Sequence, residues 1–136
     1  MFLLDTDILS ALRRRDRHPE LVQWITQQRA DCLYLSVITI GEIERGITAQ
    51  HGKNPEFAAL LAQWLGQLQA VYGDRILAVD LETAKRWGRL SAAIGNPSAD
   101  LMIAASALTH GLSVVTRNVR HFTPTGVPVI NPFHGP

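Results

Sequence analysis

Short apolar runs typical of buried strands alternate with helical patterns along the whole chain. The first run, Phe2-Leu3-Leu4, ends abruptly in Asp5, and apolar residues at helical spacing follow at once, up to about Leu12. Parallel strands need a crossover connection, which is usually a helix. The alternation therefore predicts an α/β fold with a mostly parallel sheet and helices on both faces.

Five strands and six helices can be assigned from these patterns. The strands are residues 2–5, 33–36, 75–79, 113–116 and 128–130. The first helix runs to about residue 12, and the second begins at His18-Pro19-Glu20. The third covers about 40–50, and the fourth follows the turn at 51–55. The fifth follows Asp80, and the sixth covers 99–110 before Gly111. The third helix is expected to begin with a capping box formed by Thr39 and Glu42. Right-handed crossovers would place all strand carboxyl ends along one edge of the sheet.

Length and composition indicate one globular domain over residues 1–136, since 46% of the chain is hydrophobic and 18% is charged. Cys32 is the only cysteine, which excludes an internal disulfide and fits a reducing cytoplasm. No signal peptide is evident, and no apolar run reaches the ~18 residues of a membrane span. We therefore expect a soluble, cytoplasmic protein without a membrane partner.

The net charge of +1 creates no overall field that favours nucleic acid or a membrane. Arginines are nevertheless clustered. One group near the N-terminus and a pair near the C-terminus could contact phosphates or simply form a solvated surface: Arg13, Arg14, Arg15 and Arg17, and then Arg117 and Arg120.

Three carboxylates are predicted to meet at the carboxyl edge of the sheet, where ligands bind in α/β folds. Asp5 ends the first strand, and Glu42 lies in the first turn of the helix after the second strand. Asp100 begins the helix that leads back into the fourth strand, and a parallel crossover requires that helix to start at the same edge. Converging carboxylates repel one another unless a cation joins them. Their hard oxygen atoms suit Mg²⁺ or Mn²⁺, which can activate water against a phosphodiester.

Each acid also has a purely structural interpretation. Glu42 can be a capping-box partner, and Asp100 can complement a helix dipole. Asp7 and Asp80 have the positions of ordinary N-caps. Asp5 is the hardest to explain in this way, because an apolar strand gains nothing from ending in a carboxylate.

Four segments, in this order, resemble the PIN-domain toxins of bacterial toxin–antitoxin pairs, the VapC type. The segments are Leu3-Leu4-Asp5-Thr6-Asp7-Ile8-Leu9-Ser10, then residues 36–46, residues 99–107, and Val115-Thr116-Arg117-Asn118 with Phe122. The stretch Gly-Glu-Ile-Glu-Arg-Gly at 41–46 is similar to the FitB-like branch. The resemblance spans nearly the whole chain. It implies a three-layer α/β/α sandwich with a five-stranded, mostly parallel sheet, and a metal-dependent endoribonuclease activity.

The same resemblance implies roles for individual residues. The catalytic acids that hold Mg²⁺ or Mn²⁺ would be Asp5, Glu42 and Asp100, supported by Thr6, Thr116 and Asn118. The ion would activate water, and Asp100 or Glu42 would assist proton removal. The candidate substrate contacts are Arg117, Arg120 and His121.

His121 stands where many relatives carry a fourth acid. This substitution leaves open whether the site takes one metal ion or two. It also leaves open whether His121 contacts the substrate or metal, or is a plain surface residue.

The implied partners are an RNA substrate, a cognate antitoxin, a second copy of the chain in a homodimer, and operator DNA through the antitoxin complex. An apolar stripe on the long helix supports a dimer contact or an antitoxin groove, or else it only packs in the core: Phe57, Leu60, Leu61, Trp64, Leu65 and Leu68.

Two other functions are compatible with parts of the sequence. A non-catalytic PIN-like module could act with an antitoxin in binding operator DNA. Asp5 and Asp7 also have the Asp-x-Asp spacing of haloacid-dehalogenase-type phosphotransferases, but neither Lys53 nor Lys85 follows a strand, as such a site would need.

Overall fold

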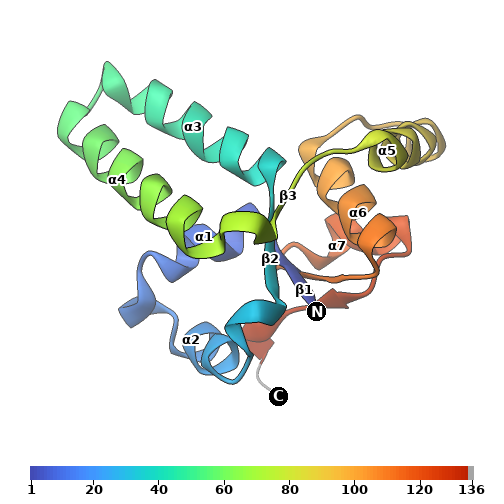
Figure 1. Ribbon diagram of the computed structural model, residues 1–136, viewed down its shortest axis with the longest axis horizontal. Helices are drawn as coiled ribbons and strands as arrows, with labels where there is room; N and C mark the ends of the chain where they lie inside the picture. The colour runs from blue at the N-terminus through green and yellow to red at the C-terminus, as the bar shows by residue number, and fades with distance from the viewer. Residues whose placement is uncertain (135–136) are drawn as a thin grey trace.

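A five-stranded, all-parallel sheet forms the centre of the computed structural model, which describes residues 1–134 (Figure 1). The strand order is β3-β2-β1-β4-β5. The five strands are β1 (Phe2–Leu4), β2 (Leu33–Ser36), β3 (Ile76–Leu77), β4 (Ser113–Val115) and β5 (Val129–Ile130). The predicted α/β class and the five strands are confirmed, and the sheet is wholly parallel.

Strand β3 is shorter than the predicted 75–79, because it is an edge strand whose partner, β2, stops early. Ile76 pairs with Leu35 and Leu77 pairs with Ser36, where β2 ends and a helix begins. Beyond Leu77 the chain therefore has no ladder to join, and Arg75 belongs to a short 3₁₀ turn.

Within residues 1–134, seven α-helices connect and cover the strands (Figure 1). They are α1 (Thr6–Leu12), α2 (Pro19–Thr26), α3 (Val37–His51), α4 (Pro55–Tyr72), α5 (Leu81–Ile94), α6 (Ala99–His110) and α7 (Val119–Phe122). Short 3₁₀ turns lie at Arg15–Arg17, Ala30–Cys32, Gly73–Arg75, Thr123–Thr125 and Pro132–His134. No helix in this described part of the chain is both long enough and apolar enough to cross a membrane.

The helix ends follow local sequence signals, with one correction. Asp80 caps α5 as predicted, since its side chain accepts the Thr83 N–H at 2.8 Å. The capping box of Thr39 and Glu42 is wrong: α3 begins at Val37, because the hydroxyl of Ser36 accepts the Ile38 N–H at 3.0 Å. Strand β2 therefore passes into α3 without a loop, and both predicted capping residues lie inside the helix.

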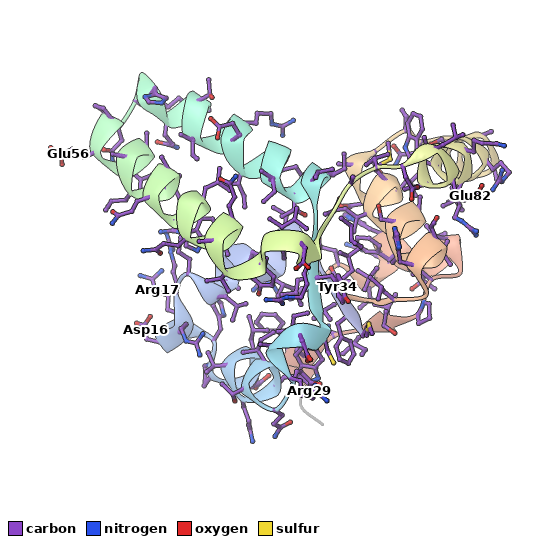
Figure 2. The ribbon with its side chains drawn as sticks, in the orientation of Figure 1. Asp16, Arg17, Arg29, Tyr34, Glu56 and Glu82 are labelled. Atoms are coloured by element: carbon purple, nitrogen blue, oxygen red, sulfur yellow. The ribbon has the colours of Figure 1, made fainter. Side chains whose placement is uncertain are left out.

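Two apolar layers pack against opposite faces of the sheet, because successive strand side chains point to opposite sides. Leu3 and Val114 contact α6 and α7, and Tyr34, labelled in Figure 2, packs against the same cluster. Leu4 and Val115 contact α1 and α2 on the other face. The predicted three-layer α/β/α arrangement is thus confirmed.

Helices α3 and α4 form a hairpin that extends away from the sheet (Figure 1). Most of the predicted apolar stripe on α4 packs inside the molecule, with Leu65 buried between the two helices and Trp64 and Leu68 against both neighbouring clusters. Leu60 is the exception, with 61% of its surface exposed.

Candidate active site

Asp5 lies where β1 turns into α1, at the carboxyl edge of the sheet. Its backbone N–H donates to the carbonyl of Val115 on β4, which holds the residue in register with the neighbouring strand. Its Oδ1 accepts the N–H of Thr6 at 2.8 Å, so Asp5 also stands at the N-cap position of α1. Only 3% of the residue is exposed. The chain therefore places a carboxylate beneath the surface at the sheet edge.

Thr116 supports Asp5 from the end of β4. Its buried hydroxyl donates to Asp5 Oδ2 at 2.8 Å and accepts the backbone N–H of Asn118 at 2.9 Å. The predicted supporting residues Thr116 and Asn118 thus lie together with the first acid, although Asn118 acts here through its backbone.

Thr6 connects the first acid to the second. Its hydroxyl lies 2.6 Å from Glu42 Oε1 and 2.9 Å from the hydroxyl of Thr39. A carboxylate can only accept hydrogen bonds, so Thr6 donates to Glu42 and accepts from Thr39. Sequence reasoning considered Thr39 only as a cap. Its position three residues before Glu42 is the signal that could have placed both on one face of a helix.

Asp100 enters the site from the first turn of α6, as the crossover argument predicts. Its Oδ2 lies 2.9 Å from His121 Nδ1 on α7. His121 has an exposed side chain and is a direct neighbour of the third acid.

Burial raises the pKa of Asp5 to about 6, from an ordinary value of 3.8. The hydrogen bond from Thr116 opposes this rise, and the negative charges of Asp100 and Asp7 add to it. Within residues 1–134 no Lys, Arg or His forms an ion pair with Asp5. The site thus holds a buried carboxylate whose partners in this part of the chain are neutral donors.

Arg117 forms a second charged unit beside the acids. Its Nε and Nη2 donate to the two carboxylate oxygens of Asp7 at 2.9 and 3.0 Å, and its guanidinium lies 4.5 Å from the centre of the Phe133 ring. Asp7 is therefore an ion-pair partner, and its interpretation as an N-cap is wrong because Asp5 occupies that position.

Within the described residues 1–134, no three Asp, Glu, His or Cys side chains form a ready-made metal cage. Thr6 forms hydrogen bonds with both Asp5 and Glu42. Asp100 affects Asp5 only through its negative charge, which raises the pKa of Asp5. The donor chemistry nonetheless fits a hard divalent cation. All three groups offer carboxylate oxygens, and a cation would relieve the uncompensated charge of Asp5.

Comparison with known proteins places this geometry in a family context. The family model described as "PIN domain" matches residues 2–124. The chain is 34% identical to the plasmid stability protein StbB of Pseudomonas syringae pv. tomato, with 98% of this chain and 99% of the relative covered. It is 32% identical to the VapC ribonuclease Y4jK of Sinorhizobium fredii, with 98% of each covered.

Solved structures agree with this placement. The crystal structure of FitAcB from Neisseria gonorrhoeae matches with a TM-score of 0.86 and 31% identity, covering 98% of this chain and 99% of that chain. A structure of FitAB bound to the IR36 DNA fragment matches with a TM-score of 0.85 and 29% identity, covering 98% and 96%.

Proposed function

The chain belongs to the PIN-domain family and to its VapC/FitB-type ribonuclease toxins of toxin–antitoxin systems, and from this premise we propose that it is a Mg²⁺- or Mn²⁺-dependent endoribonuclease. Its substrate would be the phosphodiester bonds of RNA. The observation that carries the proposal is the buried carboxylate of Asp5 at the sheet edge, which has no cationic partner within residues 1–134 and is coupled to Glu42 through Thr6 and to Asp100 through charge.

Asp5, Glu42 and Asp100 would hold the metal. When bound, Mg²⁺ or Mn²⁺ would activate water and stabilise the charge that develops on the phosphodiester. Thr116 fixes the carboxylate of Asp5, and Thr6 fixes that of Glu42. Glu42 or Asp100 then takes up the proton released by the attacking water.

His121 restrains Asp100 through their 2.9 Å contact, so one carboxylate oxygen of Asp100 faces the imidazole while the other stays available to a metal or to water. Arg117 and Arg120 supply positive charge for the RNA backbone near these acids.

We further propose that the chain acts as a homodimer and binds a cognate antitoxin. Leu60 and Val71 support such a partner surface, because 61% and 66% of these apolar residues are exposed on α4. They lie eleven residues apart, which places them on the same face of the helix.

A second candidate function is that of a non-catalytic partner of the antitoxin on operator DNA. The replacement of a fourth acid by His121 favours it, and the similar FitAB complex is a structure bound to a DNA fragment. Under this alternative, the protein would contact operator DNA only through the antitoxin complex.

Cleavage of RNA by purified protein with added Mn²⁺ separates these functions. We expect cleavage by the wild type, loss of cleavage in Asp5→Asn and Asp100→Asn, and full activity in Asp16→Asn, which removes an exposed carboxylate from the 3₁₀ turn after α1 (Figure 2). Circular dichroism would check that each variant is folded. Cleavage that persists in both active-site variants would contradict the proposed mechanism.

A further inference from the structure

On the premise of the ribonuclease function above, we propose that a pocket next to the acids binds one nucleotide of a single-stranded RNA, adjacent to the phosphate that is cleaved. The pocket has a volume of about 690 Å³. This lies within the roughly 300–1,000 Å³ that is typical of small-molecule sites. Its lining residues are Arg117, Asn118, Val119, Arg120, Thr123, Pro124 and Asn131.

The pocket lies at the same sheet edge as the acids. Arg117 and Asn118 follow β4, and Asn131 follows β5, whereas Asp5 follows β1 on the other side of β4. Two strand spacings separate β1 from β5, which is roughly 10 Å. A strand of RNA with one phosphate at Asp5 can therefore place its next nucleotide over the ends of β4 and β5.

A shared hydrogen-bonded hydroxyl ties the pocket to the acidic site. Thr116 donates to Asp5 and accepts the N–H of Asn118, so the loop that lines the pocket is anchored on the carboxylate itself. A substrate group seated against Arg117 and Asn118 is consequently fixed relative to Asp5.

The two arginines provide the anion-binding part of the pocket. Arg120 is exposed and forms no ion pair within residues 1–134, so its charge is not neutralised by the described protein. Arg117 is held by Asp7 through Nε and Nη2 and by the Phe133 ring, which leaves Nη1 for a ligand. One guanidinium held by Asp7 and a second without an ion pair in this part of the chain suit a phosphate group.

The remaining residues suit a base and its sugar. Asn131 Oδ1 accepts the Phe133 N–H at 3.0 Å, which orients the amide and leaves the two hydrogens of Nδ2 as donors. Asparagine amides recognise base edges, and single-stranded RNA exposes those edges. Val119 and Pro124 add apolar surface for the flat faces of the nucleotide.

Binding of a short fluorescein-labelled single-stranded RNA, measured by anisotropy in the presence of a chelator, tests the pocket without cleavage. We expect Arg120→Ala to weaken binding about fivefold to tenfold at low salt and to reduce the slope of log K against log salt by about 0.7, the value for one phosphate contact on a single strand. The matched control is Lys53→Ala. Lys53 is exposed, forms no ion pair within residues 1–134, and lies in the turn between α3 and α4, so its loss should leave the slope unchanged.

Asn131 is tested with two variants that separate folding from recognition. Asn131→Asp keeps the oxygen that accepts the Phe133 N–H but replaces the donors with a negative charge, whereas Asn131→Ala removes both. A recognition role predicts that both variants lose base preference, in binding to short RNAs of different base and at mapped Mn²⁺-dependent cleavage sites. The added negative charge of Asn131→Asp weakens binding to every RNA, so a purely structural role predicts weaker binding by this variant with the wild-type base preference kept.

The outcomes separate this pocket from the proposed function. Wild-type binding by Arg120→Ala and wild-type base preference in both Asn131 variants, in a protein that still cleaves RNA, overturn the pocket and leave the ribonuclease function standing. An equal loss in Lys53→Ala also overturns it, because only general charge would then matter. Binding that depends on Arg120, with a base preference that depends on Asn131, in a protein that cleaves no RNA supports the pocket and rejects the function.

Discussion

Replacing Asp5 by Asn removes a buried negative charge and keeps the shape of the side chain, so its effect on stability should change sign with pH. The pKa of Asp5 is raised from 3.8 to about 6 in the folded protein, chiefly by burial. A rise of this size corresponds to about 3 kcal/mol of unfavourable free energy once the folded carboxyl is ionised.

The pH window follows from the direction of the shift. Because the folded pKa lies above the unfolded value, the wild type loses stability as the pH rises from about 4 through about 6, and the loss is constant above that range. The amide that replaces the carboxyl in Asp5→Asn cannot titrate, so the variant lacks this loss. The variant does forfeit the hydrogen bond that Thr116 donates to Asp5 Oδ2, at a cost of about 1 kcal/mol.

In a chelator at pH 8 we therefore expect Asp5→Asn to be about 2 kcal/mol more stable than the wild type, which for a domain of this length raises the Tm by roughly 6 °C. At pH 3, where Asp5 is protonated in the folded protein and largely protonated in the unfolded chain, the order should reverse, with the variant about 1 kcal/mol less stable because only the lost hydrogen bond remains. Thermal denaturation followed by circular dichroism at both pH values measures this difference.

Asp16→Asn is the control, since its exposed carboxylate has no ion pair within residues 1–134 and its loss should leave the Tm unchanged at both pH values. A lower Tm for Asp5→Asn than for the wild type at pH 8, or a difference that does not vary with pH, would refute the reasoning and make Asp5 a structural residue.

Three further predictions use other parts of the molecule. Mn²⁺ at a hundred times its dissociation constant should stabilise the wild type by about 2.7 kcal/mol in thermal melts and Asp5→Asn by much less, and an equal gain in both would remove Asp5 from the metal site. Asp80→Ala should lower the free energy of unfolding in urea by about 0.5–2 kcal/mol through loss of the α5 cap, with RNA cleavage unchanged; a loss of cleavage by the folded variant would contradict a capping role. Light scattering should report a dimer for the wild type and a larger monomer fraction for Leu60→Glu or Val71→Glu, and a monomeric wild type at micromolar concentration would count against the dimer.

The sequence alone determined the fold class and the strand and helix ends at which Asp5 and Asp100 lie. Strand-like and helical periodicities depend only on neighbouring residues, so they can be recognised in the sequence. Their alternation indicated a parallel sheet with helices on both faces. The parallel crossover rule then brought Asp5 and Asp100 to one edge without any knowledge of side-chain contacts. Local signals also predicted the Asp80 cap and the end of α6 at Gly111, where a φ of +68° favours glycine.

Only the tertiary structure decided how the side chains meet. Thr6 and Glu42 lie 36 residues apart, and Thr116 and Asp5 lie 111 apart, so no local pattern reports their hydrogen bonds. The same holds for the contact of His121 with Asp100.

Two predicted helix caps were wrong, because another residue occupies the N-cap position in each case. Thr39 became a buried partner of Thr6 because Ser36 had already capped α3. Asp7 became the partner of Arg117 because Asp5 had taken the cap of α1. Helix and strand preferences are summed over adjacent residues, so the sequence could place Asp5 and Asp100 at the ends of particular elements. A hydrogen bond between distant side chains exists only once packing has fixed both side chains in space. The hydrogen-bond partners of the acids were therefore decided by the tertiary structure.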